Sequence, residues 1–237
     1  MKKNISAKQF SIIVPAFNEF YNLKKLYEEI VNSLDGYNFE IIFIDDCSTD
    51  KSLDLLKTLS KNDKIVKILS NKSNSGQSYS IFKGVKNSSH DIIVTIDADL
   101  QNDPKDIVKL LNIYLKNKYE LIGGIRTKRN DSVVKILSSR IANYVRSSIL
   151  KDKCSDTGCS LKVFNKKIFL NFPYFDGIHR FLPALFSGFG HKTYFIEVNH
   201  RKRMAGKSKY GVSNRLFRGI KDMLYVKKII NQNKIYK

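Results

Sequence analysis

Several features that mark common protein classes are scarce in this sequence. There are only three cysteines among 237 residues, and no two of them have CxxC spacing, so neither a disulfide framework nor a zinc site is indicated. No uncharged apolar run approaches the roughly 18 residues that a membrane-spanning helix needs, and the N-terminal MKKNISAKQF lacks the apolar stretch of a signal peptide. We therefore expect a cytoplasmic protein that meets a membrane peripherally, at its cytoplasmic face, or through a separate membrane protein.

Acidic residues are also scarce: there are 22 of them against 42 lysines and arginines, which gives a formal net charge of +20. A field of this sign attracts polyanions such as nucleic acid, an anionic membrane surface or a diphosphate substrate. The chain has no recognisable nucleic-acid recognition motif, and its acidic clusters would repel phosphate unless a metal were bound. Nucleic-acid binding is therefore a distant alternative, and we expect no nucleic acid among the partners.

The first half of the chain alternates between two kinds of hydrophobic pattern. Short β-branched runs bounded by turn residues predict strands, at 10–14, 40–44, 65–69, 91–96 and 119–125. Between the first three of these strands, apolar residues recur at helical spacing, and Asp50 and Asp103-Pro104 are typical of helix starts. This alternation predicts an α/β fold, a mainly parallel sheet with helices on both faces.

The second half has a less regular pattern. A helical stretch is expected at 131–150, a loop around 156–158, and a terminal amphipathic helix at 214–230, which either lies on anionic lipid or packs on the body of the protein. An aromatic cluster is expected in the core, with the alternative that part of it faces lipid; its members are Phe169, Phe172, Tyr174, Phe175, Phe181 and Phe186.

Carboxylates directly follow two of the predicted strands. In a parallel sheet ligands bind beyond the carboxyl ends of the strands. The alternating pair in Asp97-Ala98-Asp99 suits one hard cation, Mg²⁺ or Mn²⁺, that also bridges a diphosphate. An isolated pair of this kind is more often a solvated turn, but the preceding IIVTI reads as a buried strand and favours the metal site. Asp45 and Asp46 suit hydrogen bonds from a nucleobase or ribose, while Ser48 or Asp50 caps the following helix.

Three segments, VPAFNE, DDCSTD and DADLQNDP, occur in an order and spacing that resemble the family-2 glycosyltransferases with a GT-A fold. Later segments around 124–126, 156–158, 179–183 and 200–211 resemble the polyprenol-phosphate sugar transferases, the dolichol-phosphate mannose synthase group. Each motif is weak alone, but their ordered combination is specific. Two departures stand out: Cys47 replaces a glycine of the family, and 74–78 reads NSGQS where the family has Asn-x-Gly-x-Gly.

The resemblance implies a Rossmann-like GT-A domain over residues 1–211, with a nucleotide-binding half at about 10–128 and an acceptor half at about 129–211, followed by a basic amphipathic helical tail at 212–237. The implied nucleotide pocket contains Pro15, Phe17, Glu19, Ile44, Asp45 and Asp46. The implied metal and diphosphate site contains Asp97, Ala98, Asp99 and Gln101. The implied contacts to donor or acceptor phosphate are Arg126, Arg140, Arg203 and Lys209.

The implied activity is inverting, metal-dependent transfer of a hexose from a nucleotide diphosphate sugar to a polyprenyl phosphate, for cell-envelope glycan or glycoconjugate synthesis. Such an acceptor is already anionic and needs no strong general base. The alternative is a soluble glycosyltransferase acting on a hydroxyl of a saccharide or lipopolysaccharide precursor, for which Asp156 is the candidate base. The chain has no tryptophan, which favours single transfer over the processive synthases with their tryptophan-containing acceptor motif. His179 and Arg180 read equally as catalytic or as structural hydrogen-bonding residues.

Overall fold

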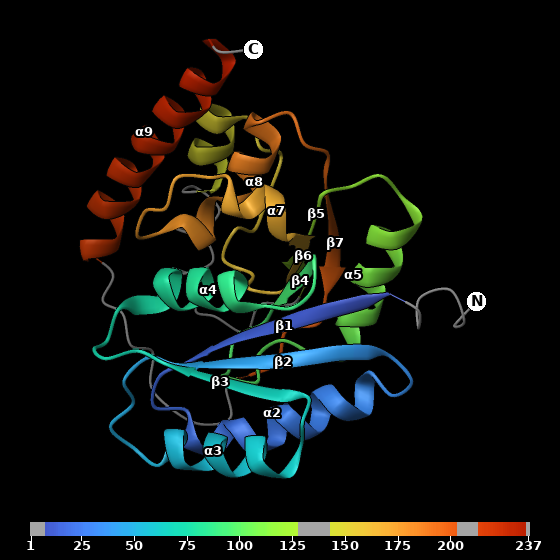
Figure 1. The fold of residues 1–237 in the computed structure, drawn as a ribbon. Helices are drawn as coiled ribbons and strands as arrows, with labels where there is room; N and C mark the ends of the chain where they lie inside the picture. Colours follow the sequence, from blue (N-terminus) through green and yellow to red (C-terminus); the bar gives the residue numbers. More distant parts are fainter. Residues whose placement is uncertain (1–7, 128–142, 203–212, 236–237) are drawn as a thin grey trace.

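The computed structural model describes residues 8–127, 143–202 and 213–235, and they form one seven-stranded sheet with helices on both faces (Figure 1). The sheet order is β3-β2-β1-β4-β6-β5-β7. The strands are β1 (Gln9–Ala16), β2 (Asn38–Asp45), β3 (Val66–Ser70), β4 (Ile92–Thr95), β5 (Leu121–Arg126), β6 (Lys162–Asn165) and β7 (Thr193–Val198). The named helices are α2 (Phe20–Ser33), α3 (Ser52–Asn62), α4 (Gly76–Asn87), α5 (Lys105–Lys116), α7 (Lys166–Leu170), α8 (Ile178–Gly188) and α9 (Ser213–Ile235).

Strand direction sets which residues reach the same edge of the sheet. The pairs β1–β2, β1–β4, β2–β3 and β5–β7 are parallel, and β6 is antiparallel to both β4 and β5. Ala16 is in register with Asp45, and Ile13 with Thr95. The residues after β1, β2 and β4 therefore meet at one edge, and β6 begins at that same edge.

Alternate residues of the central strands feed two separate cores. In β1, Ile12 and Val14 face the layer of α2, α3 and α5, whereas Ile13 faces α4, α8 and α9. The sheet lies between these two layers. In Figure 1, α2 and α3 lie below the sheet, and α4, α7, α8 and α9 lie above it. Gly84 of α4 lies against the sheet so closely that an added Cβ would come within 2.7 Å of Ile13 and Ile44. The sheet is thus buried on both faces, as parallel sheets require.

The five strands predicted in the first half are all present, with ends shifted by one or two residues, and the α/β class is confirmed. The amphipathic patterns did not identify α4, α8, β6 or β7. Pro183 lies inside α8, and the aromatic-rich sequence around it hides the helical period. Of the six aromatic residues expected in the core, Phe169, Phe172, Phe181 and Phe186 are buried there, whereas Tyr174 is 40% exposed. Residues 143–150 are helical, and the earlier part of the predicted 131–150 stretch lies outside the described residues.

The predicted terminal helix is α9. Its apolar stripe of Met223, Val226, Ile229 and Ile230 is buried in the same core as α8. Gly188 of α8 permits a close approach, because a Cβ there would lie 2.6 Å from Ile230. Within the part of the chain that the structure describes, no helix has both the length and the apolar character needed to cross a bilayer.

Candidate functional site

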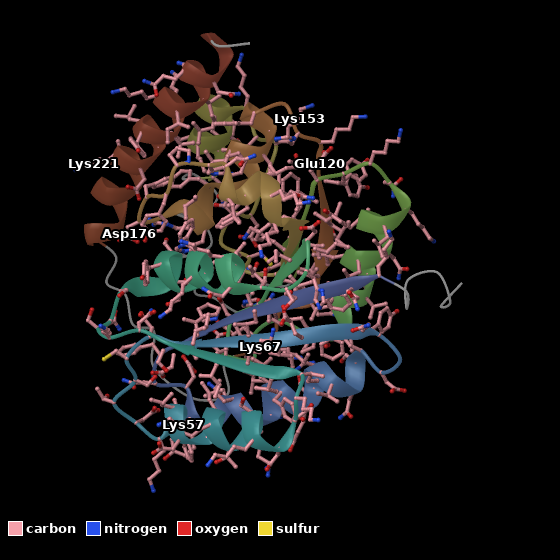
Figure 2. All side chains as sticks on the ribbon, in the orientation of Figure 1. Lys57, Lys67, Glu120, Lys153, Asp176 and Lys221 are labelled. Carbon is pink, nitrogen blue, oxygen red and sulfur yellow. The ribbon has the colours of Figure 1, made fainter. Side chains whose placement is uncertain are left out.

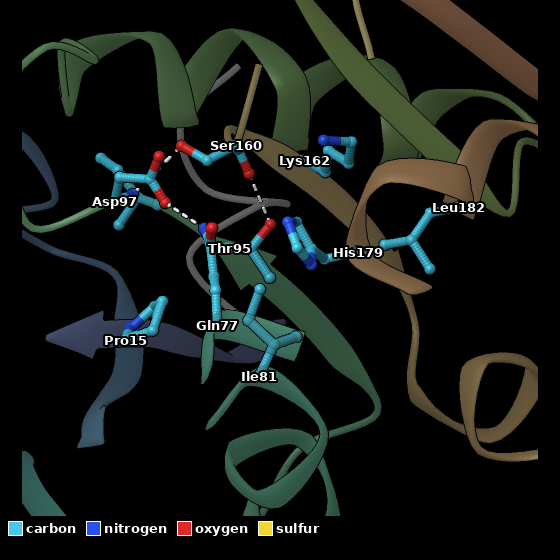
Figure 3. A pocket seen from close by; sticks show the side chains of 10 residues that line it. Pro15, Gln77, Ile81, Thr95, Asp97, Ser160, Lys162, His179 and Leu182 are labelled. Carbon is cyan, nitrogen blue, oxygen red and sulfur yellow. Dashed lines mark hydrogen bonds between the residues drawn. The ribbon is translucent and has the colours of Figure 1, made fainter. Parts of the chain in front are cut away.

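The carboxyl ends of β1 and β4 enclose a small pocket with α4 and α8 (Figure 3). Asp97 lies at its mouth and is held from two sides. Gln77 Nε2 donates to Asp97 Oδ1 over 2.7 Å, and the Asp97 amide donates to Ser160 Oγ over 3.1 Å. Figure 3 shows these two contacts beside Thr95, whose hydroxyl donates to the Ser160 carbonyl. The orientation of Asp97 is therefore fixed by residues from α4 and from the segment before β6.

The electrostatics of Asp97 are those of a crowded carboxylate. Burial, followed by the nearby charge of Asp99, raises the pKa of Asp97 to about 7, against the opposing effects of Ser160, Lys162 and Arg126. Two carboxylates that repel each other in a poorly hydrated place are stabilised when a cation binds between them. The pair thus fits the predicted Mg²⁺ or Mn²⁺ by charge and by ligand type.

Asp99 lies in a strained loop that turns back toward Gln101. Asp99 is 7% exposed, and its Oδ1 accepts a hydrogen bond from the Gln101 amide over 3.2 Å. Leu100, between them, has a φ of 61° while its side chain is buried, a conformation that costs a leucine free energy and that is common at functional sites. The Gln101 side chain reaches the Arg201 carbonyl at 3.4 Å. Over the ranges described, no three His, Cys, Asp or Glu side chains form a group that could hold a metal ion.

Asp45 and Asp46 are adjacent and buried, but their carboxylates differ in the hydrogen bonds that they accept. Asp46 accepts hydrogen bonds from Asn71 Nδ2 at 2.7 Å and from the amides of Ser75 and Gly76 at 2.8 Å each. Asp46 thereby anchors the loop that precedes α4. Asp45 accepts a long bond from the Ser48 amide through Oδ2, while its Oδ1 is buried and has no hydrogen-bond partner among the residues that the structure describes. A buried carboxylate oxygen without a partner is costly, and Asp45 is therefore the member of the pair that is available to a ligand.

The two departures from the family motifs have local explanations. Cys47 has a φ of 62°, a left-handed conformation that glycine adopts without strain, so the protein tolerates a cysteine at a position suited to glycine. Gly76 keeps the left-handed conformation, with a φ of 84°. Ser78, in place of the second glycine, is fully buried and uses its hydroxyl to accept from the Gly177 amide at 2.7 Å and to contact His179 Nδ1 at 2.7 Å. Ser78 thus joins α4 to the start of α8.

The other residues predicted for the nucleotide pocket differ in their exposure and in their distance from the pocket beside Asp97. Pro15 lines the pocket beside Asp97, and Phe17 is partly exposed just beyond β1. Glu19 is 8% exposed and accepts from Asn22 Nδ2 at 2.6 Å. The Ile44 side chain is buried against Gly84 of α4, so its place in the nucleotide pocket stays a prediction.

Arg126 and Asp156 form a bidentate pair. Arg126 Nε donates to Asp156 Oδ2 at 2.7 Å, and Nη2 donates to Oδ1 at 2.8 Å. The guanidinium lies against Gly158, where an added Cβ would come within 2.7 Å of Nη2. Both carboxylate oxygens of Asp156 are engaged by a guanidinium, which is a poor arrangement for a general base. The pair instead fixes the 156–158 loop against the end of β5.

Four site residues were not identified from the sequence: Gln77, Ser160, Lys162 and Arg201. Lys162 is a 4% exposed lysine that lines the pocket and donates to the Cys159 carbonyl. Arg201 donates to Glu29 Oε2 at 2.6 Å and to Asp103 Oδ1 at 2.8 Å. These two contacts hold the segment after β7 beside the loop that contains Gln101. Gln77 lies in the 74–78 segment and Arg201 in the 200–211 segment, but neither side chain was assigned a role there, and no motif contains Ser160 or Lys162. The predicted phosphate contacts Arg140, Arg203 and Lys209 lie outside the described residues.

His179 is the pocket residue that the sequence left between two interpretations. Desolvation, together with the positive charges of Arg180 and Lys162, lowers its pKa to about 3, so the imidazole is neutral at physiological pH. Its Nδ1 contacts Ser78, and neighbouring Arg180 pairs with Asp222 of α9 at 2.8 Å. These contacts favour the structural role for both residues.

Comparison with known proteins agrees with this geometry. The family model described as "Glycosyl transferase family 2" matches residues 11–172. The chain is 33% identical over 228 residues to a dodecaprenyl-phosphate galacturonate synthase of Rhizobium johnstonii, covering 94% of this chain and 67% of that protein. It is 32% identical over 213 residues to an undecaprenyl-phosphate 4-deoxy-4-formamido-L-arabinose transferase of Aeromonas hydrophila, covering 88% of this chain and 65% of that protein. The chain thus spans about two thirds of the length of these curated relatives.

Solved structures share the fold at low identity. Glucosyl-3-phosphoglycerate synthase from Mycobacterium tuberculosis, in complex with Mn²⁺, uridine diphosphate and phosphoglyceric acid, superposes with a TM-score of 0.68 at 16% identity, over 93% of this chain and 77% of that one. The same enzyme with Mg²⁺ and uridine diphosphate gives a TM-score of 0.71 at 14% identity, over 95% and 82%. These structures confirm the GT-A fold class and, together with the matched family model, lead to one conclusion: the chain belongs to glycosyl transferase family 2 and is a glycosyltransferase.

Proposed function

We propose that this glycosyltransferase moves a hexose from a nucleotide diphosphate sugar to a polyprenyl phosphate, with inversion at the anomeric carbon. The observation that carries the proposal is the juxtaposition, at one sheet edge, of the Asp97–Asp99 pair with the unpartnered oxygen of Asp45. The printed names of the two curated relatives, both polyprenyl-phosphate sugar transferases, support the acceptor. The proposed location is peripheral, at the cytoplasmic face of a membrane.

In this proposal Asp45 accepts a hydrogen bond from the base or ribose of the donor, and Asp97 and Asp99 hold Mg²⁺ or Mn²⁺. The ion supplies electrostatic stabilisation of the departing diphosphate. Gln77 and Ser160 fix the orientation of Asp97 through the contacts described above. An acceptor phosphate oxygen forms the new bond to the anomeric carbon from the face opposite the diphosphate, as the bond to the diphosphate oxygen breaks.

The state of Asp156 supports a phosphate acceptor over a hydroxyl acceptor. A hydroxyl needs a base to take its proton, whereas a phosphate monoester is already anionic near neutral pH. Asp156, the candidate base, has both oxygens bound by Arg126. Arg126 itself is 15% exposed at the rim, where its charge favours the approach of an anionic acceptor.

The test is nucleoside diphosphate release by the purified protein with MnCl₂, a panel of nucleotide sugars and undecaprenyl phosphate. We expect turnover that a chelator abolishes and that Asp99→Asn lowers by about 100-fold or more, because loss of an electrostatic group at a reacting centre typically costs 10²–10³ in rate. Asp54→Asn is the matched control, since that side chain is 80% exposed on α3. Equal rates for Asp99→Asn and Asp54→Asn would rule out the proposed metal site, and turnover with a soluble saccharide in place of the lipid would rule out the proposed acceptor.

A further inference from the structure

The outward side of α9 is apolar and basic. The inward stripe of this helix is used in packing against α8, so it is unavailable to a membrane. Outward, Ile220 is 45% exposed, Leu224 57% and Tyr225 42%. Lys221, Lys227 and Lys228 are exposed on the same helix. One side of α9 is thus packed in the core, and its other side exposes large apolar side chains among lysines. Exposed apolar patches of this kind are typical of surfaces that bind a protein or a membrane.

This surface continues across two neighbouring segments. Tyr225 packs on Phe175 with ring centroids 5.3 Å apart, and the next residue back, Tyr174, packs on Tyr79 of α4 at 6.3 Å. Tyr79 and Tyr174 are each 40% exposed. We call the set Tyr79, Tyr174, Ile220, Lys221, Leu224, Tyr225 and Lys228 the tyrosine rim. It runs from α9 over the 174–175 segment to the first turns of α4.

The tyrosine rim ends at the site. Tyr79 is two residues after Gln77, which holds Asp97. In Figure 1 the start of α4 and the first half of α9 lie on the same side of the molecule as the carboxyl ends of β1 and β2. Figure 2 places Lys221 and Asp176 at the upper left and Lys57 at the bottom of the molecule, on α3, across the sheet from α9. A lipid held at the rim would therefore lie on the same side of the molecule as the carboxylates that hold the metal in the proposed function.

We infer that the tyrosine rim docks the enzyme on an anionic lipid bilayer, with its site facing the acceptor. Tyrosine is favoured at the membrane–water interface because its ring is apolar and its hydroxyl is polar. Each lysine near an anionic leaflet contributes about 1 kcal/mol of attraction. Three exposed lysines of α9 outweigh Asp176, and Asp222 is already paired with Arg180. This inference rests on the proposed function for the identity of the acceptor, but not for the binding itself.

The experiment is sedimentation of the purified full chain with protein-free vesicles of phosphatidylcholine, with and without phosphatidylglycerol. We expect the wild type to bind only the anionic vesicles. Lys221→Gln/Lys228→Gln should lower the partition coefficient by roughly 30-fold, which is two lysines at about 1 kcal/mol each. Ile220→Ser/Leu224→Ser should also lower it. The control Lys57→Gln/Lys61→Gln removes the same charge from exposed positions on α3 and should bind like the wild type.

Two results would overturn the inference: absence of wild-type binding to protein-free anionic vesicles, which would point to a membrane protein partner, or equal losses in the rim and α3 variants. Transfer assays separate this from the proposed function. With undecaprenyl phosphate in vesicles, the rim variants should be slower than the wild type, and with a short, water-soluble polyprenyl phosphate they should match it. Rim-dependent vesicle binding without transfer to either acceptor would refute the proposed function and leave the docking surface standing.

Discussion

The two halves of the sheet satisfy their buried carboxylates in different ways. In the N-terminal half, where we propose that the donor binds, the buried Asp46 and the exposed Asp50 accept hydrogen bonds chiefly from backbone amides, which arrange the loops after β2 and before α4. On the acceptor side the carboxylates are bound by arginine side chains, in the pairs Arg126–Asp156, Arg146–Asp152 and Arg180–Asp222. The loops after β2 and before α4 are therefore organised by backbone amides, although Glu40 of β2 pairs with Lys67, whereas the segments proposed to face the acceptor are joined by charge pairs.

The largest expected effect on stability is at Arg146, in one of these charge pairs. This residue is 7% exposed and is bound to Asp152, which is 1% exposed. Arg146→Met leaves a buried carboxylate without its partner and should cost about 3–5 kcal/mol in the free energy of unfolding, measured by urea denaturation. Arg146→Met/Asp152→Leu should recover much of this loss, because no uncompensated charge remains. Lys153→Met, at an exposed lysine of the same loop, is the control, and a loss as large as that of Arg146→Met would refute the role of the pair.

A second test compares the two adjacent aspartates of the donor side. Asp46→Ala removes the acceptor of three hydrogen bonds, two of them from backbone amides, and should cost about 3 kcal/mol. Asp45→Asn should change stability by less than about 1 kcal/mol, because Oδ1 has no partner to lose. Donor affinity, measured by calorimetry, should nevertheless fall in Asp45→Asn. Equal destabilisation by the two changes would contradict the division of roles between them.

A third test uses pH at the junction of the halves. The pKa of His179 is lowered to about 3 by burial, Arg180 and Lys162, while in the unfolded chain it returns to its ordinary value near 6.5. Below pH 6.5 the unfolded state binds the extra proton, so stability should fall with pH from 6.5 toward 3, by up to about 1.4 kcal/mol per pH unit. His179→Gln, which has no titratable ring, should show a shallower decline in a pH series of urea midpoints. Identical slopes would show that the ring is not buried in its neutral form.

The smallest expected effect is at Cys47. Because its φ of 62° is unfavourable for a side chain with a Cβ, Cys47→Gly should relieve about 1 kcal/mol of backbone strain, partly offset by the greater freedom of glycine in the unfolded chain. We expect a small rise in the thermal midpoint with unchanged turnover. Cys47→Ala, which keeps the Cβ, separates strain from loss of the thiol. A rise in the alanine variant equal to that in glycine would argue against strain.

Sequence reasoning was most successful on the donor side. The strands there are short apolar runs, and Asp45, Asp46, Asp97 and Asp99 directly follow them, so a local pattern locates both the fold and the acids. Gln77, Ser160 and Lys162 act through contacts across the fold: Gln77 and Asp97 are 20 residues apart, and Ser160 is 63 from Asp97. Such partners are brought together by the packing of α4 on β1 and β2 and by the pairing of β6 with β4, and no local periodicity in the sequence predicts either contact. The helix α8 was missed because most of its residues are buried and apolar, so its sequence shows no alternation between a polar and an apolar face.

The reversed direction of β6 has a further consequence. A parallel strand would begin at the far edge of the sheet, but β6 starts with Lys162 beside Thr95, close to Asp97. The connection that enters β6 therefore ends beside Asp97, where Ser160 accepts from the Asp97 amide. Because Asp156 of this connection is bound by Arg126 and Cys159 is buried in the core with α2 and α5, a change in its length would reach Asp97 as well as the end of β5.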